Sequence, residues 1–194
     1  MPRPGANQPR LDRERVVRAA ADLVNAEGAG ALTINRLARE LNVQPPSLYN
    51  HVDGLEDLQR KLALLNAHRL GECITQAAVG QTGAPAVRSV AQAYRAYILQ
   101  NPGLYFASLR ASGNQPQPDA GLQEAEARIV QVVLAILKPF GLSGEDALHA
   151  VRGLRSLVHG FASLEASGGF GLPLECDESF RRLVEMFVRG MGNS

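Results

Sequence analysis

The sequence has few of the residues that mark a disulfide-bonded, metal-binding or membrane protein. It contains two cysteines, Cys73 and Cys176, which lie far apart and belong to no CxxC motif. This number and spacing exclude a disulfide framework and a zinc site, so we expect two reduced thiols and no bound metal. No run of roughly 18 apolar residues occurs, and residues 1–9 are too polar for a signal peptide. These absences predict a cytoplasmic protein with no membrane partner.

Motifs of catalysis are also missing. The sequence has no GxSxG nucleophile elbow, no P-loop, no HExxH motif and no carboxylate pair in a recognisable setting. The glycines in 168–171 resemble a dinucleotide-binding loop only superficially, because no strand is predicted before them and Pro173 blocks a helix start. We therefore expect no enzymatic activity and no cofactor. A helical enzyme stays the main alternative from another functional class.

The sequence has little net charge. The formal total is +1, and the first 60 residues contain as many Asp and Glu as Arg. A nucleic-acid-binding protein often carries a basic excess, and an architectural DNA-binding protein without a ligand switch would need one. Any DNA binding must therefore depend on where a few side chains are placed.

What the sequence does contain is helical periodicity, with no segment that alternates like a strand. The pattern predicts an all-α protein of about nine helices, bounded by Gly, Pro and Asn-Pro breaks. The expected helices are Asp12–Glu27, Ile34–Leu41, Pro46–His51, Leu55–Val79, Ala84–Asn101, Gly103–Arg110, Ala120–Phe140, Gly144–Ser167 and Asp177–Gly190.

The second and third of these helices have the spacing of a helix-turn-helix. Thr33 can cap the second helix. Asn42 lies where the chain must reverse, and Asn tolerates the left-handed conformation that such a reversal needs better than most residues. Pro46 suits the first position of a new helix, and we expect that Pro45 prevents an earlier start.

In the third helix Leu48 and Val52 are expected to face inward, which leaves Ser47, Tyr49 and His51 facing outward. A helix that binds in the DNA major groove needs outward polar and aromatic side chains on a short helix whose start is fixed. From spacing alone, a plain helical hairpin of a scaffold explains the pattern equally well.

The region Leu23–Leu58 resembles the DNA-binding signature of tetracycline-repressor-like (TetR) regulators. The shared pattern is Gly28, Leu32-Thr33, Leu37-Ala38, Leu41, Val43, Ser47-Leu48-Tyr49, His51-Val52 and Leu58. The resemblance implies a homodimeric, ligand-responsive regulator, usually a repressor released from a double-stranded DNA operator by a small molecule. It also implies that residues 1–11 form an arm, 12–54 the DNA-binding domain, and 55–194 the domain for ligand binding and dimerisation.

The resemblance further implies which residues meet DNA. Family members contact base edges, nearby phosphates or the DNA backbone from matching positions, and Asn35 has the amide that pairs with the edge of adenine. The predicted DNA-binding set is Thr33, Asn35, Arg36, Gln44, Pro45, Pro46, Ser47, Tyr49, Asn50 and His51. One departure is Leu55, where the family usually has a phosphate-binding Lys. We therefore expect a shallower salt dependence of operator binding than a strongly basic regulator shows.

The last two helices carry the candidate dimer interface. The apolar stripe on Asp177–Gly190 and the small residues of the preceding helix favour a four-helix interface, with packing on the core of one chain as the alternative. The predicted interface residues are Gly153, Gly160, Phe180, Leu183, Val184, Phe187, Val188 and Met191.

A polar stripe on Gly144–Ser167 comprises His149, Arg152, Arg155 and His159. It is either a solvated face or the polar wall of a cavity for an anionic or hydrogen-bonding ligand. Its His159-Gly160 pair resembles a His-Gly signature of one TetR subgroup, although Val158 replaces the tryptophan that often precedes it there. The predicted ligand-binding residues are Tyr97, Tyr105, Phe106, Arg152, Arg155 and His159.

Overall fold

The computed structural model describes residues 11–113 and 119–192, and all regular structure within them is helical. The predicted all-α fold is thereby confirmed, and each of the nine expected helices is present with ends shifted by at most a few residues. Of the predicted arm, residues 1–11, all but Leu11 lies outside the described residues. The helices are α1 Arg13–Glu27, α2 Ile34–Glu40, α3 Pro45–Leu48, α4 Leu55–Ala78, α5 Gly83–Gln100, α6 Pro102–Gly113, α7 Ala120–Leu137, α8 Gly144–Ala166 and α9 Cys176–Met191, with 3₁₀ helices at Ala29–Ala31 and Lys138–Phe140.

The helix ends follow the local chemistry of the sequence. The Asp12 carboxylate accepts a hydrogen bond from the backbone N–H of Arg15 at 2.8 Å and so caps α1. Thr33 caps α2 in the same way, through the N–H of Arg36 at 3.0 Å. Gly28 ends α1 with φ 84° and ψ 164°, a positive-φ conformation that favours glycine and differs from the left-handed helical one common at helix ends.

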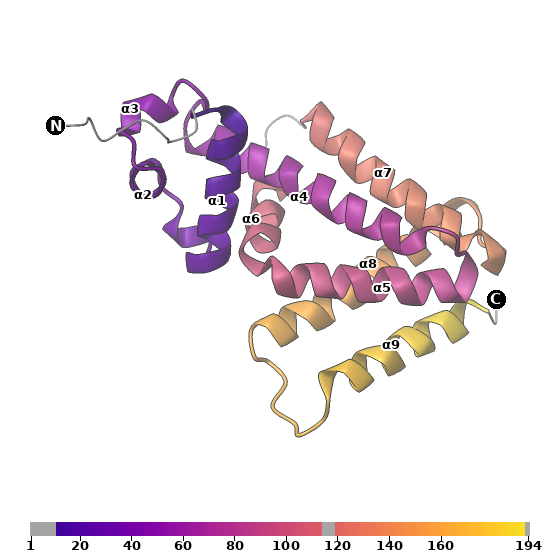
Figure 1. Cartoon of the computed structure of the whole chain (residues 1–194). Helices are drawn as coiled ribbons and strands as arrows, with labels where there is room; N and C mark the ends of the chain where they lie inside the picture. The colour runs from indigo at the N-terminus through magenta and orange to yellow at the C-terminus, as the bar shows by residue number, and fades with distance from the viewer. Residues whose placement is uncertain (1–10, 114–118, 193–194) are drawn as a thin grey trace.

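The helices form two parts, a small head and a larger body (Figure 1). The head consists of α1, α2 and α3, and its apolar core also takes Leu58 and Leu62 from α4 and Leu104 from α6. The body consists of α4 to α9 around a second core built from α4, α5, α7, α8 and α9, with Tyr105 from α6. Helix α4 therefore belongs to both cores and connects the two parts without a linker.

Helix α6 is the second connection between head and body. The Asn25 side chain on α1 accepts a hydrogen bond from the backbone N–H of Leu104 at 2.8 Å, so a head residue caps a body helix. At Gly103 the two helices approach so closely that an added Cβ would overlap the backbone carbonyl of Val24. A movement of α6 must therefore move α1 as well.

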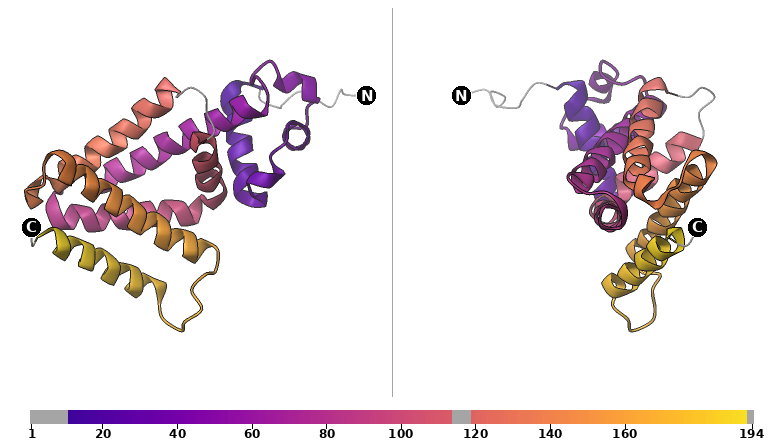
Figure 2. Two further views of the ribbon diagram at one scale, coloured as in Figure 1. Left: turned by 180° about the vertical axis from the view of Figure 1, so that it is seen from behind. Right: turned by 90° about the vertical axis from the view of Figure 1, so that its right-hand side faces the viewer.

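One edge of the body is made by α9, which packs on α8 and α5 (Figure 2). The buried Arg95 of α5 joins the three helices, because its guanidinium bridges Glu165 at the end of α8 and Asp177 at the start of α9. The same guanidinium stacks on the rings of Phe161 and Phe180.

In the part of the chain that the structure describes, no single helix is long and apolar enough to cross a membrane. The pair Ala120–Phe140 and Gly144–Ala166 meets the length and composition test only jointly, and it is bent by 113°.

Candidate DNA-binding site and ligand cavity

The reversal between α2 and α3 has the geometry of a tight helical turn. Asn42 has φ 54°, the one positive value among the described non-glycine residues, as its position in the sequence predicted. The N–H of Val43 donates to the carbonyl of Ala38 at 2.9 Å, and the half-buried Val43 side chain packs against the head core. This turn fixes the direction in which α3 starts.

Helix α3 starts one residue earlier than expected. Gln44 is the N-cap with φ −77° and ψ 141°, and Pro45 and Pro46 occupy the first two helical positions. The expectation that Pro45 blocks an earlier start was wrong, because neither position needs an N–H donor in the first turn of a helix. The result is a stub of one turn, closed by the hydrogen bond from Ser47 N–H to the Gln44 carbonyl at 2.9 Å.

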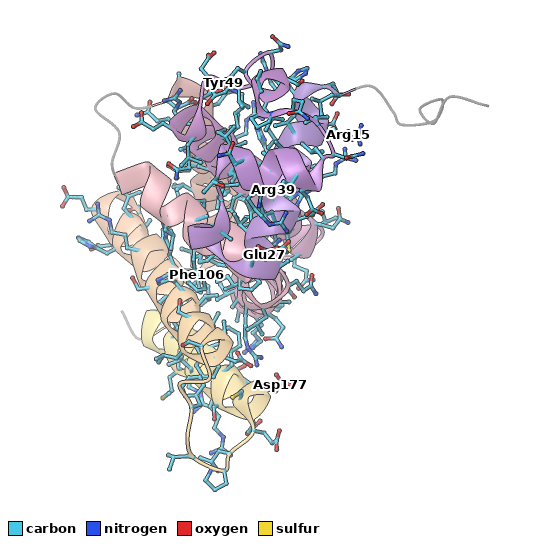
Figure 3. All side chains as sticks on the ribbon, turned by 90° about the vertical axis from the view of Figure 1, so that its left-hand side faces the viewer. Arg15, Glu27, Arg39, Tyr49, Phe106 and Asp177 are labelled. Atoms are coloured by element: carbon cyan, nitrogen blue, oxygen red, sulfur yellow. The ribbon has the colours of Figure 1, made fainter. Side chains whose placement is uncertain are left out.

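One face of the α3 stub is exposed to solvent, and the other face is packed into the head core. Leu48 is 0% and Val52 2% exposed, and both lie in the head core. Tyr49 is 55% exposed, and it lies at the outer side of the head (Figure 3). The remaining predicted contacts of this segment divide into exposed side chains and half-buried ones: Gln44, Pro46 and Asn50 are exposed, while Pro45, Ser47 and His51 are half-buried.

The predicted contacts on α2 differ in how available they are. Thr33 and Asn35 are exposed at the start of the helix. Arg36 is half-buried, and its guanidinium donates to the carboxylates of Glu27 and Glu40. Arg36 thus joins the end of α1 to α2, which is a positioning role that sequence reasoning missed. Its DNA contact stays a prediction, and the two carboxylates already use three of its five N–H donors.

Asp57, an acidic residue in the first turn of α4, also has a structural role. Asp57 is buried, and its carboxylate accepts hydrogen bonds from the N–H of Asp53 at 2.9 Å and from the side chains of Lys61 and Arg60. Burial alone would raise the pKa of Asp57, but these hydrogen bonds outweigh it and lower the pKa below its usual value. The ionised carboxylate therefore holds the start of α4 against the loop that follows α3.

Replacing Asp57 with asparagine tests this role through pH. At neutral pH the variant is expected to lose about 1.5 kcal/mol of unfolding free energy, since asparagine keeps the Asp53 contact and loses the charge-assisted bonds. Because the folded-state pKa is lowered, the wild-type advantage is full above the unfolded-state pKa and disappears as the pH falls through the folded-state pKa. Urea unfolding of both proteins from neutral to acidic pH measures the difference. A gap that stays constant over this range would contradict the role.

A cavity of about 570 Å³ lies between α4, α5, α6, α7 and α8. Most of its lining is apolar, and its polar groups include Asn66, Tyr94, Tyr105 and Ser108. A cavity of this size, with apolar walls and few polar groups, is typical of a small-molecule site. A wider hollow of about 900 Å³ between α5 and α9 has charged walls whose groups largely pair with each other, as Arg88 does with Glu185.

At one wall of the cavity a chain of hydrogen bonds joins α8, α5 and α6. The Tyr94 hydroxyl lies 2.8 Å from the Tyr105 hydroxyl, and the Tyr105 hydroxyl lies 3.0 Å from Nδ1 of His159. The positive charge of Arg155 acts on the Tyr94 end of this chain. Burial and, secondly, the charge of Arg155 lower the pKa of His159, which keeps this ring neutral.

The structure separates the predicted ligand residues into two layers. Tyr105, Arg152 and Arg155 line the cavity. His159 and Phe106 lie behind Tyr105, in edge or tilted ring contact with it. Tyr97 is buried, donates to the side-chain oxygen of Asn66 at 2.9 Å and has its pKa raised by burial to about 12.

The exposed His149 is not among the lining residues. The polar stripe is thus solvent-exposed at His149, Arg152 and Arg155, and two of these, Arg152 and Arg155, also line the cavity. Sequence reasoning missed Asn66, Gln123 and Glu126 on the opposite helices.

The predicted interface residues on α9 divide by burial. Four of them lie in the core of the chain itself and are not available to a partner in this conformation: Phe180, Val184, Val188 and Met191. Leu183 and Phe187 are half-buried. A Cβ on Gly153 would lie 3.1 Å from the ring of Phe187, so this glycine allows close packing within the chain. A Cβ on Gly160 would meet nothing within 4 Å.

Comparisons with known proteins agree with this arrangement. Residues 87–187 match the family model described as "Tetracyclin repressor-like, C-terminal domain". The chain is 35% identical over 188 residues to the HTH-type transcriptional regulator Rv0681 of Mycobacterium tuberculosis, covering 96% of this chain and 84% of that protein. It is 33% identical over 182 residues to the HTH-type transcriptional regulator YobS of Bacillus subtilis, covering 93% of each.

Solved structures share the whole fold. The crystal structure of Mycobacterium smegmatis BioQ has a TM-score of 0.71 and 25% sequence identity, over 95% of this chain and 99% of that one. A second structure, of BioQ with its double-stranded DNA operator, has a TM-score of 0.69 and 24% identity, over 95% and 100% of the two chains.

Proposed function

Because the chain belongs to the tetracycline-repressor-like (TetR) family of transcriptional regulators, we propose that it is a homodimeric repressor which a small molecule releases from its operator. DNA binding and regulation of transcription come with the family. The proposal adds the residues that meet DNA, the cavity that takes the effector, and the boundary between residues 12–54 and 55–194.

One observation carries the assignment of the DNA-binding surface. The α3 stub holds Gln44, Tyr49 and Asn50 exposed while Leu48 and Val52 fix it from below. A short helix anchored in this way can enter a major groove without rearranging its own core. Thr33 and Asn35 at the start of α2 are exposed, and so is Arg39 later in the same helix, which lies below Tyr49 in the view of Figure 3.

Selection of duplexes from a random pool with the purified protein tests the function and supplies the operator. On that operator, Tyr49→Phe is expected to weaken binding about equally for all sequences, since a phosphate hydrogen bond carries no sequence information. Asn35→Ala is expected to relax the preference at one base pair, because an adenine-reading amide is lost. Competition titrations with single-base operator variants separate these results. Equal losses on every variant for Asn35→Ala would remove it from base reading.

Two helices support a route from the cavity to the head. Asn66 and Leu70 of α4 and Tyr105 and Ser108 of α6 line the cavity, and both helices also enter the head core. A ligand that displaces α4 or α6 must therefore shift the head, and with it the distance between the two heads of a dimer. The two heads of a dimer must lie about 34–36 Å apart to bind two half-sites that are separated by one turn of DNA. A modest change in this separation is therefore enough to release the DNA. The expected coupling is about 1–3 kcal/mol.

The dimer interface that we propose uses the outer faces of α8 and α9. Leu164 of α8 and Met186 of α9 are exposed apolar side chains on this helix pair. Gly160 leaves an open position on the same helix for close approach of a second chain. The loop between the helices adds Leu172 and Leu174, which are 75% and 69% exposed. A second copy would cover these side chains, as expected for an interface of two helices from each chain.

A further inference from the structure

The cavity contains two arginines whose charge the protein does not balance, and this observation bears on its ligand. Arg152 and Arg155 lie on α8 in the cavity lining. Several other arginines of the body pair with carboxylates, as Arg88, Arg95 and Arg128 do, whereas Arg69 and Arg189 lie outside the cavity lining. Within the described residues, neither Arg152 nor Arg155 forms an ion pair.

The charged side chains that line the cavity have a net charge of +1. Glu126 on α7 is the one carboxylate among the lining residues, and within the described parts of the chain it is paired with neither arginine. Two guanidinium groups against one carboxylate leave a net charge of +1. His159 lies behind Tyr105 and is neutral, so it adds no charge.

The two arginines stand next to apolar surface. Leu70 and Ile74 of α4, Val90 of α5, Val133 of α7 and Leu154 of α8 line the cavity and are buried. Such walls favour a hydrocarbon or aromatic body, because each apolar group transferred from water contributes favourably. Arg152 and Arg155 are both solvent-exposed, so their guanidinium groups stand where the apolar cavity meets the solvent.

From these observations we propose that the ligand is an amphipathic organic acid with one carboxylate and an apolar body. The carboxylate is bound by Arg152 and Arg155, and the body lies against the apolar helices. A guanidinium matches a carboxylate with two parallel hydrogen bonds. A phosphate ester would bring a second negative charge toward Glu126, and a cationic ligand would meet two arginines. This inference rests on the proposed function, since it names the chemical class of the effector.

A DNA-free binding experiment tests the proposal with two matched fluorescent probes. Anilinonaphthalene sulfonate is a singly charged anion, and phenylnaphthylamine is the same ring system without the sulfonate. Both are titrated into the full-length protein, into Arg152→Gln/Arg155→Gln, and into the control Arg128→Gln/Arg182→Gln. The control removes the same charge from exposed arginines that pair with carboxylates outside the cavity.

The expected result is a difference between the probes. The wild type and the control bind the sulfonate more tightly than the neutral probe, and Arg152→Gln/Arg155→Gln loses at least about tenfold in affinity for the sulfonate. Its affinity for the neutral probe stays within about twofold, which also shows that the variant is folded and its cavity intact. Decanoate is expected to displace the neutral probe from the wild type at lower concentration than decanol or decyl phosphate.

Three results would overturn the proposal: no saturable binding of either probe to the wild type, equal affinity for both probes, or equal displacement by decanoate and decanol. Tighter displacement by decyl phosphate would replace the carboxylate with a phosphate. None of these readouts involves DNA, so a failure here is distinct from a failure to select an operator.

Discussion

Replacing Gly103 with alanine is expected to lower the free energy of unfolding by at least about 2 kcal/mol, the upper range for overpacking. The added Cβ would overlap the carbonyl of Val24 and lie 2.7 Å from Cα of Asn25. Both obstacles are backbone, so no rotamer change relieves them, and α1 and α6 must move apart. Chemical unfolding of the variant and the wild type measures the loss.

Gly190→Ala is the matched control for this substitution. Gly190 lies within α9, and a Cβ there would meet nothing within 4 Å. Gly190 lies in the last turn of α9, where the preference of a helix interior for alanine over glycine, about 0.5–1 kcal/mol, applies only in part. This variant is therefore expected to be at least as stable as the wild type. A Gly103→Ala protein as stable as Gly190→Ala would show that α1 and α6 do not pack closely. If they do pack closely, the surviving folded Gly103→Ala protein is also expected to bind its operator more weakly, because the head is displaced.

Replacing Leu48 with alanine is expected to cost about 2–4 kcal/mol of unfolding free energy. Leu48 is 0% exposed and is the apolar anchor of the α3 stub in the head core. A helix of one turn has almost no stability of its own, so losing this anchor is expected to free the stub as well. Thermal or urea unfolding gives the stability, and operator titration under folding conditions gives the second effect.

Leu172→Ala provides the comparison for Leu48. It removes the same side chain from a position that is 75% exposed, in the loop between α8 and α9. Its operator affinity is expected to match the wild type when protein concentrations are high enough to keep the proposed dimer. An unchanged operator affinity in Leu48→Ala, with the protein folded, would mean that α3 needs no anchor to bind DNA.

Local chemistry made the helices and the helix-turn-helix predictable. Asp12 and Thr33 cap their helices as their side chains predicted, and Asn42 adopts the positive φ that the reversal needs. The inward Leu48 and Val52 follow from helical spacing. Pro45 starts α3 despite the steric preference against helix before a proline, because the first turn of a helix needs no N–H donor at that position.

Contacts between distant helices were not predictable in this way. The apolar stripe of α9 marks a buried face, but spacing does not tell whether it is buried in one chain or between two, and Phe180 lies in the chain's own core. Gly103 and Asn25 are 78 positions apart in the sequence, and no local pattern predicts that their backbones lie close together. Arg152 and Arg155 of the polar stripe on α8 line a cavity because α4 and α7 form its opposite walls, and the positions of those helices are not visible in the local sequence.

The central claim is that the exposed face of α3 binds the operator. The most direct measurement is the affinity for the selected duplex, by fluorescence anisotropy, of the triple variant Gln44→Ala/Tyr49→Ala/Asn50→Ala. All three side chains are exposed, so the fold is expected to stay intact, and Gln76→Ala/Val79→Ala at the far end of α4 is the control. We predict that the triple variant loses at least about 100-fold in affinity while the control keeps that of the wild type. A folded triple variant that binds as tightly as the control would contradict the claim.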